Sequence, residues 1–287
     1  MDRNTVSPRE AIKGLKTYLS SLGDVAVAFS GGVDSSVLLA VAVQALADSK
    51  NKLTALTAIS QAYPGSDLRS AEQVVETLSV PWEKLKTDVL SIPGVSANRE
   101  DRCYHCKKHV FSKLIVFAQK HGLGTVVDAT NFSDLSEYRP GRKALEELGV
   151  KSPFLELGID KATIRILARD LSLKTADRPS TACLLTRLPY GTRPTNGLLA
   201  RLDKAEDFLR SIGFGVVRVR HHGDIARLEL GEQELPLAIE MHDNISETLL
   251  GMGWKFVTLD LAGYEPGRFD KIGDNNKNGE RQRQEEK

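Results

Sequence analysis

The sequence predicts an α/β fold, with a doubly wound parallel sheet followed by a smaller C-terminal α+β module. Two observations carry this prediction. Short apolar runs alternate with helical patterns over the first half of the chain, and the first run ends in a glycine pair that opens into a helix. Alternation of this kind favours a parallel sheet, because a crossover helix returns the chain to the same end of the sheet before the next strand begins.

The expected elements follow in order along the chain. Apolar residues recur at helical spacing over residues 7–22, which predicts an amphipathic helix ahead of the sheet. Strands are then expected over 25–29, 53–59, 82–87 and 125–129, and helices over 37–47, 68–78 and 110–121. Ligands of open parallel sheets collect at the carboxyl ends of the strands. Residues 30–36, Ser60 and residues 128–131 are therefore expected to meet at one edge.

A second region is predicted beyond a proline-rich loop. There the pattern gives a helix over 198–212, strands over 216–220 and 225–230, helices over 235–244 and 246–251, and a strand over 256–261. The predicted domains are 1–178 for the sheet domain, 179–197 for a cysteine-bearing loop and linker, and 198–269 for the small module. Residues 270–287 are nearly all charged or amide-bearing, which predicts a disordered tail.

Net charge, the length of apolar runs and the number of cysteines exclude some classes of function. The formal net charge is +1, with 39 basic and 38 acidic residues, and this balance argues against a nucleic-acid partner. The sequence has no apolar run long enough to cross a bilayer and no secretion signal at its start, so a cytoplasmic protein is expected without a membrane partner. Three cysteines are an odd count, which favours metal or thiol chemistry over a disulfide framework.

The glycine pair belongs to the segment Phe-Ser-Gly-Gly-Val-Asp-Ser-Ser at residues 29–36. Glycines let backbone N–H groups approach a phosphate, and the following helix adds the positive end of its dipole. The lysine of the Walker loop is absent, and the segment does not fit the dinucleotide fingerprint. The carboxylate of Asp34 could hold Mg²⁺ on the phosphates, while the serine hydroxyls could bind phosphate oxygens. The plain alternative is a glycine turn with ordinary helix caps.

The segment resembles the pyrophosphate loop of the N-type ATP pyrophosphatases, known as PP-loop enzymes, whose sheet is of the HUP type. That resemblance implies that ATP adenylylates a substrate oxygen and that pyrophosphate leaves. The predicted ATP and pyrophosphate contacts are Ala28, Ser30, Gly31, Gly32, Asp34, Ser35, Ser36, Ser60, Asp128, Thr130 and Asn131.

Sulfur chemistry is indicated by the cysteines. Cys103 and Cys106 lie one helical turn apart, and Cys183 follows in the proline-rich loop. Three thiolates could hold a cubane iron–sulfur cluster and leave one iron open for an exogenous sulfide. Other interpretations stay open at this stage. A structural zinc could add His105, His109 or His121 as a ligand; Cys103 and Cys106 could form a redox pair; or the thiols could be inert.

Further segments narrow the resemblance to the LarE family of ATP-dependent sulfur transferases, which make the nickel-pincer cofactor of lactate racemase. They are residues 128–131 with Asp134, residues 138–141, 178–183, 187–192 and 217–220. The resemblance implies that a carboxylate of pyridinium-3,5-biscarboxylate mononucleotide is adenylylated and converted to a thiocarboxylate. It also implies a sulfide donor, a homo-oligomer, and partners among the nickel-pincer pathway proteins, including lactate racemase.

Family members differ in their cysteines. Those with one cysteine, at the position of Cys183, sacrifice its sulfur, whereas those with the additional pair hold a 4Fe-4S cluster whose open iron carries the sulfide. Cys103 and Cys106 therefore imply the cluster type and repeated turnover. This chain departs from the expected pattern at Ala129, Arg178 and Thr186, where Gly, Lys and Ser are expected.

Arginines are the candidates for binding the substrate's carboxylates and phosphate, since planar guanidinium groups match both. They are Arg139, Arg187, Arg218 and Arg220. Alternation along the strand places the last two on one face, opposite valines. The alternative is a solvated face paired with Glu229 or Glu206. Glu206 is also a candidate ligand for a divalent metal, and His221 and His222 fit either turn residues or ligands.

Three rival functions remain from the sequence. A PP-loop tRNA thiolase with a three-cysteine cluster would need a local RNA-binding surface. An amide-forming synthetase of the NAD synthetase kind would explain the loop but leave the cysteines without a role. A non-catalytic nucleotide-binding module would bind ATP without releasing pyrophosphate.

Overall fold

The structure is a computed structural model that describes residues 6–136 and 140–265. It divides into two compact units, Met1–Ala182 and Cys183–Lys287. This division falls within residues 179–197, the expected linker, while the predicted domain limits themselves stay predictions. The predicted disordered tail at 270–287 lies outside the described residues.

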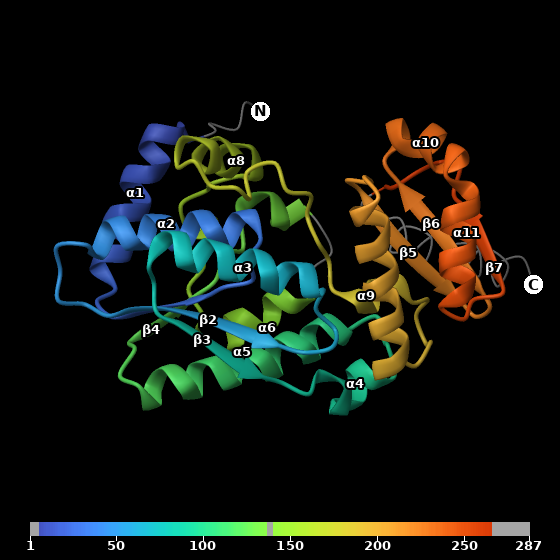
Figure 1. Ribbon diagram of the computed structural model, residues 1–287. Helices are drawn as coiled ribbons and strands as arrows, with labels where there is room; N and C mark the ends of the chain where they lie inside the picture. The colour runs from blue at the N-terminus through green and yellow to red at the C-terminus, as the bar shows by residue number, and fades with distance from the viewer. Residues whose placement is uncertain (1–5, 137–139, 266–287) are drawn as a thin grey trace, which may run out of the picture. The chain divides into compact units, whose positions relative to one another are not determined.

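The described strands of the first unit form a parallel sheet in the order β3-β2-β1-β4 (Figure 1). Their bounds are Val25–Ala28 for β1, Leu53–Ile59 for β2, Trp82–Lys86 for β3 and Thr125–Val127 for β4. In the central strand, Val25 pairs with Leu53 on one side and with Thr125 on the other. The predicted α/β class with a parallel sheet is therefore confirmed. β1 and β4 end earlier than predicted, because Phe29 and residues 128–129 already turn into the loops at the carboxyl edge.

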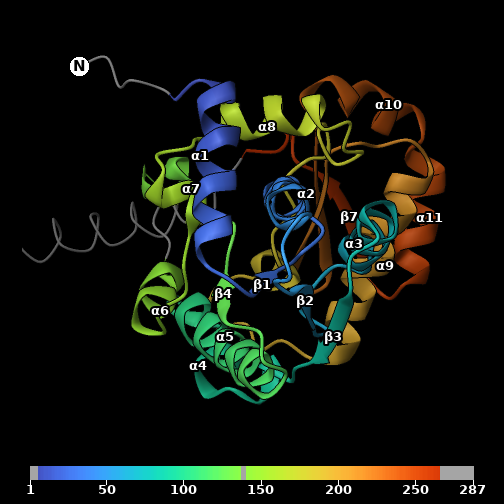
Figure 2. The ribbon, with the colours of Figure 1, turned by 90° about the vertical axis from the view of Figure 1, so that its left-hand side faces the viewer.

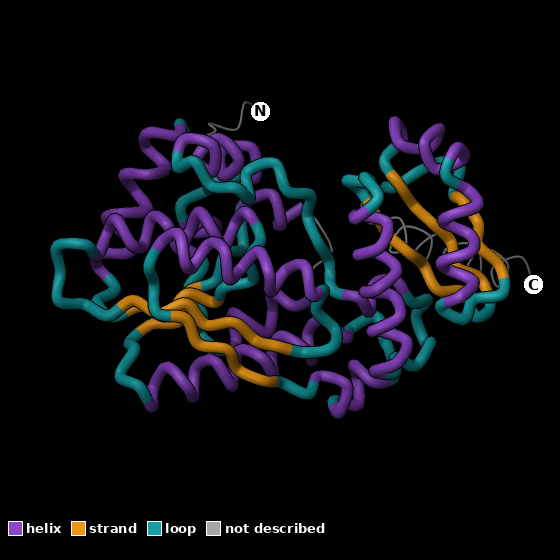
Figure 3. Tube along the Cα trace, viewed as in Figure 1, coloured by secondary structure: helices purple, strands orange, loops and turns teal. Residues whose placement is uncertain are grey.

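Helices cover both faces of this sheet (Figures 2 and 3). α2 (Val33–Leu46) and α3 (Gly65–Leu78) lie on one face, and α5 (Arg102–Lys120) lies on the other. α2 is buried almost all round, because α1 (Pro8–Ser21) and α8 (Lys161–Asp170) pack against its outer side. Each fully buried leucine of α2 contributes about 1.5–3 kcal/mol. This packing fixes the helix that follows the glycine pair.

Several boundaries differ from the prediction. α2 begins at Val33 instead of residue 37, since the carbonyl of Gly32 already accepts the first helical bond from the N–H of Ser36. α5 begins at Arg102 instead of residue 110, because its first two turns carry polar side chains without an apolar period. The remaining helices of this unit, apart from α8, are α4 (Pro93–Ser96), α6 (Gly141–Glu147) and α7 (Pro153–Glu156). α4 and α6 to α8 were not predicted.

The second unit contains a small mixed sheet in the order β5-β6-β7 among its described residues. β5 (Val217–His222) and β6 (Ile225–Leu230) form an antiparallel hairpin, and β7 (Phe256–Leu259) joins β6 in parallel. α9 (Asn196–Ser211) packs against β5. Two helices are present where two were expected, α10 (Leu235–Glu240) and α11 (His242–Gly251), but the break between them falls at Met241 instead of residue 245. No helix in the described ranges has the length and apolar character needed to span a bilayer.

Candidate active site

The glycine pair forms a tight loop between β1 and α2. Gly31 has a φ of 75°, and a Cβ built on it would lie 2.5 Å from the carbonyl oxygen of Asp67 and 2.6 Å from the amide nitrogen of Ala71. Only glycine fits so close to the backbone of α3. Gly32 caps α2 without a side-chain hydrogen bond, so the N–H groups of the first turn are not taken up by the cap and keep their capacity for an anion.

Hydroxyl groups line this loop. The Oγ of Ser35 donates to the carbonyl of Gly32 at 3.1 Å and lies 3.2 Å from the Oγ of Ser30. The Oγ of Ser36 donates to the same carbonyl at 2.9 Å. The N–H of Gly32 donates to the Oγ of Ser30 at 3.4 Å. The loop and the start of α2 are therefore held in one arrangement by their own side chains before any ligand binds.

Asp34 brings distant segments to the loop. Its Oδ1 accepts from the Nζ of Lys161 at 2.5 Å, and its Oδ2 accepts from the Nδ2 of Asn131 at 3.4 Å. Lys161 is the first residue of α8, whose cap is formed by Asp160 through a bond from the N–H of Thr163. A lysine from a position far along the chain thus lies beside the loop, whose own sequence contains none.

The other predicted nucleotide contacts lie at the same carboxyl edge of the sheet. Asp128 follows β4 and is buried, and it accepts from the hydroxyls of Thr130 and Ser152 at 2.5 Å each. The Oγ of Ser60, after β2, accepts from the N–H of Ala62. Ala28 is the last residue of β1. Their roles in binding ATP stay predictions.

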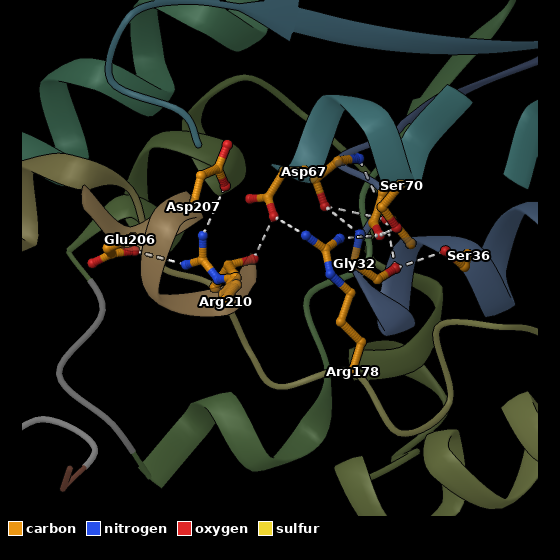
Figure 4. A network of polar contacts seen from close by, with 12 residues as sticks. Gly32, Ser36, Asp67, Ser70, Arg178, Glu206, Asp207 and Arg210 are labelled. Carbon is orange, nitrogen blue, oxygen red and sulfur yellow. Dashed lines mark hydrogen bonds and ion pairs between the residues drawn. The ribbon is translucent and has the colours of Figure 1, made fainter. Parts of the chain in front are cut away.

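A second polar network holds the loop from the side of α3 (Figure 4). Arg178 donates from one terminal nitrogen to the carbonyl of Gly31 at 3.1 Å and from the other to the Oδ1 of Asp67 at 2.7 Å. The Oγ1 of Thr181 donates to the same Oδ1 at 2.7 Å, and the Oγ of Ser70 donates to the carbonyl of Gly31 at 2.9 Å.

Two of the cysteines lie near the start of α5. Cys103 is exposed and Cys106 is half-buried, and the Oη of Tyr63 lies 3.6 Å from the Sγ of Cys106. The structure has all three cysteines as thiols. Such soft ligands suit zinc or an iron–sulfur cluster.

The histidines considered for zinc have local partners or a shifted pKa. The Nε2 of His105 lies 3.1 Å from the Oδ2 of Asp101, and the Nδ1 of His121 lies 2.8 Å from the carbonyl of Phe117. Burial, together with the nearby charge of Lys113, lowers the pKa of His109. Within residues 6–136 and 140–265, no three His, Cys, Asp or Glu side chains are grouped as a metal site.

Cys183 begins the second unit and precedes a 3₁₀ turn over Leu184–Arg187. Arg187 at the end of this turn is fully buried and pairs bidentately with Glu206, with Nε to Oε1 at 2.8 Å and Nη2 to Oε2 at 3.0 Å. Its Nη1 donates to the carbonyl of Cys183 at 3.4 Å. The predicted substrate residue Arg187 therefore also anchors the turn that carries the cysteine.

Glu206 is enclosed by donors. Besides Arg187, it accepts from Arg210 at 2.8 Å and from the N–H of Val219 at 3.1 Å, and Figure 4 shows its contact with Arg210. Burial alone would raise the pKa of Glu206, but Arg187 and Arg210 hold it below its ordinary value. Both carboxylate oxygens are thus taken up by cations, and a metal role for this residue stays a prediction.

The arginines of β5 are buried, not solvated. Arg220 donates to the Oε2 of Glu229 at 2.7 Å and to the carbonyl of Thr186 at 2.6 Å. The guanidinium of Arg218 lies 4.8 Å from the ring centroid of Tyr264, and burial lowers its pKa, with the charge of Arg187 adding to the effect. A cationic group in such a place suits an anionic ligand. Arg139 lies outside the described residues.

His221 and His222 end β5 at the hairpin turn. The Nε1 of Trp254 donates to the Nδ1 of His221 at 3.2 Å, which requires that nitrogen to be unprotonated. Burial lowers the pKa of both histidines, and neighbouring arginines lower it further. These contacts give His221 a structural partner.

Sequence reasoning missed Lys161, Asp67 and the contacts of Arg178. Lys161 and Asp67 belong to no local motif, since they reach the loop from α8 and α3, and the contacts of Arg178 depend on the packing of α3 against the loop. The sequence singled out Arg178 only because a lysine was expected there. In the structure its two terminal nitrogens donate to two different acceptors, which the single nitrogen of a lysine side chain is less suited to do.

Comparison with known proteins identifies the family. The asparagine synthase family matches residues 14–93, which contain the phosphate loop. The pyridinium-3,5-bisthiocarboxylic acid mononucleotide synthase of Lactiplantibacillus plantarum is 35% identical over 256 residues, covering 89% of this chain and 92% of that protein. An uncharacterized protein of Synechocystis is 33% identical over 91% of this chain and 97% of its own length.

A tRNA-cytidine(32) 2-sulfurtransferase of Bdellovibrio bacteriovorus is 32% identical over 122 residues, covering 39% of this chain and 47% of that protein. The match to the mononucleotide synthase, by contrast, extends over nearly the whole of both chains, so it includes the second unit as well as the loop. The chain therefore belongs to the LarE family of PP-loop, ATP-dependent sulfur transferases.

Proposed function

We propose that this enzyme converts a carboxylate of pyridinium-3,5-biscarboxylate mononucleotide to a thiocarboxylate through an acyl adenylate. The observation that carries the proposal is the match over 89% of the chain to a synthase of the bisthiocarboxylic acid mononucleotide. The preformed anion cradle at the start of α2 and the cysteine pair on α5 support the two halves of the chemistry.

In the first half, a carboxylate oxygen attacks the α-phosphorus of ATP and the bond to the bridging oxygen breaks, so that pyrophosphate leaves. The backbone of Gly31 and Gly32, the hydroxyls of Ser30, Ser35 and Ser36, and the dipole of α2 suit the departing pyrophosphate. Asp34 would hold Mg²⁺ bound to the phosphates. The ammonium of Lys161 beside it adds positive charge where negative charge develops.

In the second half, sulfur attacks the carbonyl carbon of the acyl adenylate and AMP leaves with the former carboxylate oxygen. AMP is a better leaving group than the oxygen of a free carboxylate, which is why ATP is consumed first. The guanidinium groups of Arg218 and Arg220 suit the second carboxylate and the phosphate of the substrate.

A 4Fe-4S cluster fits the donor set of this chain, because three cysteine thiols are present and no disulfide joins them. Cys103, Cys106 and Cys183 would hold it. When bound, a cluster with three protein ligands supplies an iron that can carry an exogenous sulfide. Tyr63, with its hydroxyl near the Sγ of Cys106, would orient that ligand.

A second candidate function is thiolation of tRNA. It is favoured by the partial similarity to the tRNA-cytidine(32) 2-sulfurtransferase, which covers 39% of this chain. The net charge of +1 gives little long-range attraction for a polyanion.

The test is an anaerobic assay of the purified protein with Mg·ATP, sulfide and pyridinium-3,5-biscarboxylate mononucleotide. We expect mass spectrometry to find exchange of one oxygen for sulfur in the mononucleotide, with one pyrophosphate and one AMP released for each. Iron and acid-labile sulfide are measured on the same sample. Thiolated tRNA in place of the product would overturn the proposal in favour of the second candidate.

The cysteine roles are separated by mass spectrometry of the protein after turnover. Many turnovers with intact Cys183 support the cluster, and the Cys103→Ser variant should then lose both iron and turnover. A single turnover with loss of the Cys183 sulfur as dehydroalanine would support a sacrificial cysteine instead.

A further inference from the structure

Asp67 connects the phosphate loop to the segment that precedes Cys183. It stands in the first turn of α3, and its Oδ1 accepts from both Arg178 and Thr181 at 2.7 Å. The Arg178 and Asp67 side chains are only 20% and 18% exposed, so this ion pair is partly shielded from water. We call Asp67, Arg178 and Thr181 the latch.

The latch fixes the peptide between Gly31 and Gly32. The carbonyl of Gly31 accepts from Arg178 at 3.1 Å and from Ser70 at 2.9 Å, so the oxygen is held toward α3 from two directions. In a planar trans peptide the N–H points opposite to the carbonyl. The N–H of Gly32 is therefore aimed away from α3, on the side where the Oγ of Ser30 lies 3.4 Å away. There it donates to the Ser30 hydroxyl, and a bound phosphate oxygen would take the place of that acceptor.

A third contact ties the latch to α8. Arg165 donates to the carbonyl of Ala176 at 2.6 Å and to the carbonyl of Arg178 at 3.4 Å. The same helix begins with Lys161, the partner of Asp34. The chain from Ala176 to Arg178 is thus held by α8 behind it and by the phosphate loop in front of it.

The segment that contains Arg178 and Thr181 continues directly into Cys183. Thr181 stands two positions before Cys183 in the sequence. A change in the loop that displaced Asp67 or Arg178 would pull on Thr181 and hence on the chain entering Cys183. A partly shielded network with several shared acceptors has few alternative arrangements, so its parts move together.

We infer that Asp67 and Arg178 are positioning residues which aim the Gly32 N–H at the pyrophosphate, and that Thr181 couples occupancy of that cradle to the segment carrying Cys183. This inference rests on the proposed function for its choice of ligand. Arg178 binds the Gly31 carbonyl with one terminal nitrogen and Asp67 with the other. A lysine has a single side-chain nitrogen and would hold these two acceptors less well.

The first experiment measures binding of inorganic pyrophosphate and of AMP to the full-length protein by calorimetry. Arg178→Gln and Asp67→Asn should each weaken pyrophosphate binding about tenfold, the loss expected for one charge-assisted hydrogen bond, and leave AMP binding within about twofold. The matched control is Asp177→Asn, which breaks the exposed ion pair with Arg169 in the same segment. It should change neither constant. Arg178→Lys should fall between wild type and Arg178→Gln.

The second experiment tests the coupling by peptide-resolved alkylation of Cys183 with and without Mg·ATP. In the wild type, Mg·ATP should slow alkylation at least about threefold, because the occupied cradle holds the segment still. Thr181→Val should keep pyrophosphate binding within about twofold and lose that protection. Circular dichroism and the melting temperature identify any variant that has not folded; Thr181→Val and Arg178→Lys are the mildest changes.

The outcomes separate this inference from the proposed function. If Arg178→Gln and Asp67→Asn bind pyrophosphate as the wild type does, or if Thr181→Val keeps the protection of Cys183, the latch is wrong even when the wild type makes the thiocarboxylate. If the wild type makes no thiocarboxylate but the variants lose binding and protection as stated, the latch stands and the substrate assignment fails.

Discussion

Glu206 neutralises buried positive charge in the second unit. It is fully buried and accepts from Arg187, Arg210 and the backbone of Val219. The Glu206→Gln variant keeps the shape but leaves buried guanidinium charge without its carboxylate. We expect it to lose about 3–5 kcal/mol of unfolding free energy. Urea unfolding followed by Trp254 fluorescence in a Trp82→Phe background measures this, since Trp254 is buried in that unit.

Asp243→Asn is the control for the loss of one acidic charge. Its carboxylate is 97% exposed and contacts only the imidazole of His242 among the ion pairs of the described residues. Its urea midpoint should equal that of the wild type. A Glu206→Gln protein as stable as the control would mean that the cluster around Glu206 is neutralised by some other group.

Lys161 gives a second test at the residue scale, and it concerns the proposed catalysis. Its Nζ lies 2.5 Å from Asp34, where the proposed reaction develops negative charge. The Lys161→Met variant keeps the aliphatic stem and removes the cation, so we expect the rate of pyrophosphate release to fall about a hundredfold. A coupled pyrophosphate assay measures it. Lys174→Met, at an exposed position, should keep the wild-type rate; an unchanged rate in Lys161→Met would remove this residue from the mechanism.

Candidate site residues could be found from the sequence where they lie close together along the chain. The serines, glycines and Asp34 form a local pattern, and so do Cys103 and Cys106. Lys161 and Asp67 could not be found this way, because they reach the loop only through the packing of α8 and α3. The burial of Arg218 could not be predicted either. The alternation of residues along β5 separates the two faces of the strand but does not indicate what packs against each face.

Gly31 shows how elements constrain the phosphate loop. Its φ of 75° is unfavourable for other residues, and a Cβ would meet the backbone of α3. Gly31→Ala should therefore lose about 1–3 kcal/mol more stability than a glycine substitution that meets only the φ penalty. Gly23→Ala is that comparison, because Gly23 has a φ of 74° with no atom within 4 Å of its Cβ position.

Urea unfolding followed by Trp82 fluorescence in a Trp254→Phe background compares the two alanine variants, since both glycines belong to the first unit. Pyrophosphate calorimetry is the second readout: Gly31→Ala should bind at least about tenfold more weakly, and Gly23→Ala should bind normally. Equal stability of the two variants would mean that α3 can move away from the loop.

Elements were predicted best where the apolar period was strong. The strand over 53–59 and the strand over 225–230 agree with β2 and β6 at both ends. The start of α5 was missed because its first turns carry cysteine, histidine and lysine at the surface, without an apolar stripe. α8 was missed although its apolar residues pack against α2, since it is short and follows a turn-rich stretch.

Stability of the whole molecule should depend on pH through three histidines, one in the first unit and two in the second. The pKa values of His109, His221 and His222 are all lowered, each chiefly by burial. The unfolded chain therefore takes up protons below about pH 6.5 that the folded chain refuses, and unfolding free energy falls as pH falls through that value. Each histidine contributes about 1.4 kcal/mol per pH unit within its window.

Melting temperatures between pH 7.5 and 5.5 test this. They should stay level above about pH 7 and decline below about pH 6.5. His221→Gln should flatten the decline, because protonation of His221 in the wild type must break the bond from Trp254. His242→Gln, at an exposed position, should leave the slope unchanged. A wild-type protein equally stable at both ends of the range would contradict the lowered pKa values.

The first unit ends at Ala182, and the segments that hold its phosphate loop in place are among the last parts of that unit to be synthesised. β1 and the glycine pair leave the ribosome early. β4 follows nearly a hundred positions after the glycine pair, and Lys161 and the latch residues Arg178 and Thr181 follow more than a hundred positions after it. The nascent chain consequently carries an open and unbraced phosphate loop until almost the whole first unit has emerged. We therefore expect the nascent chain to bind nucleotide only after the segment that enters Cys183 has also been made.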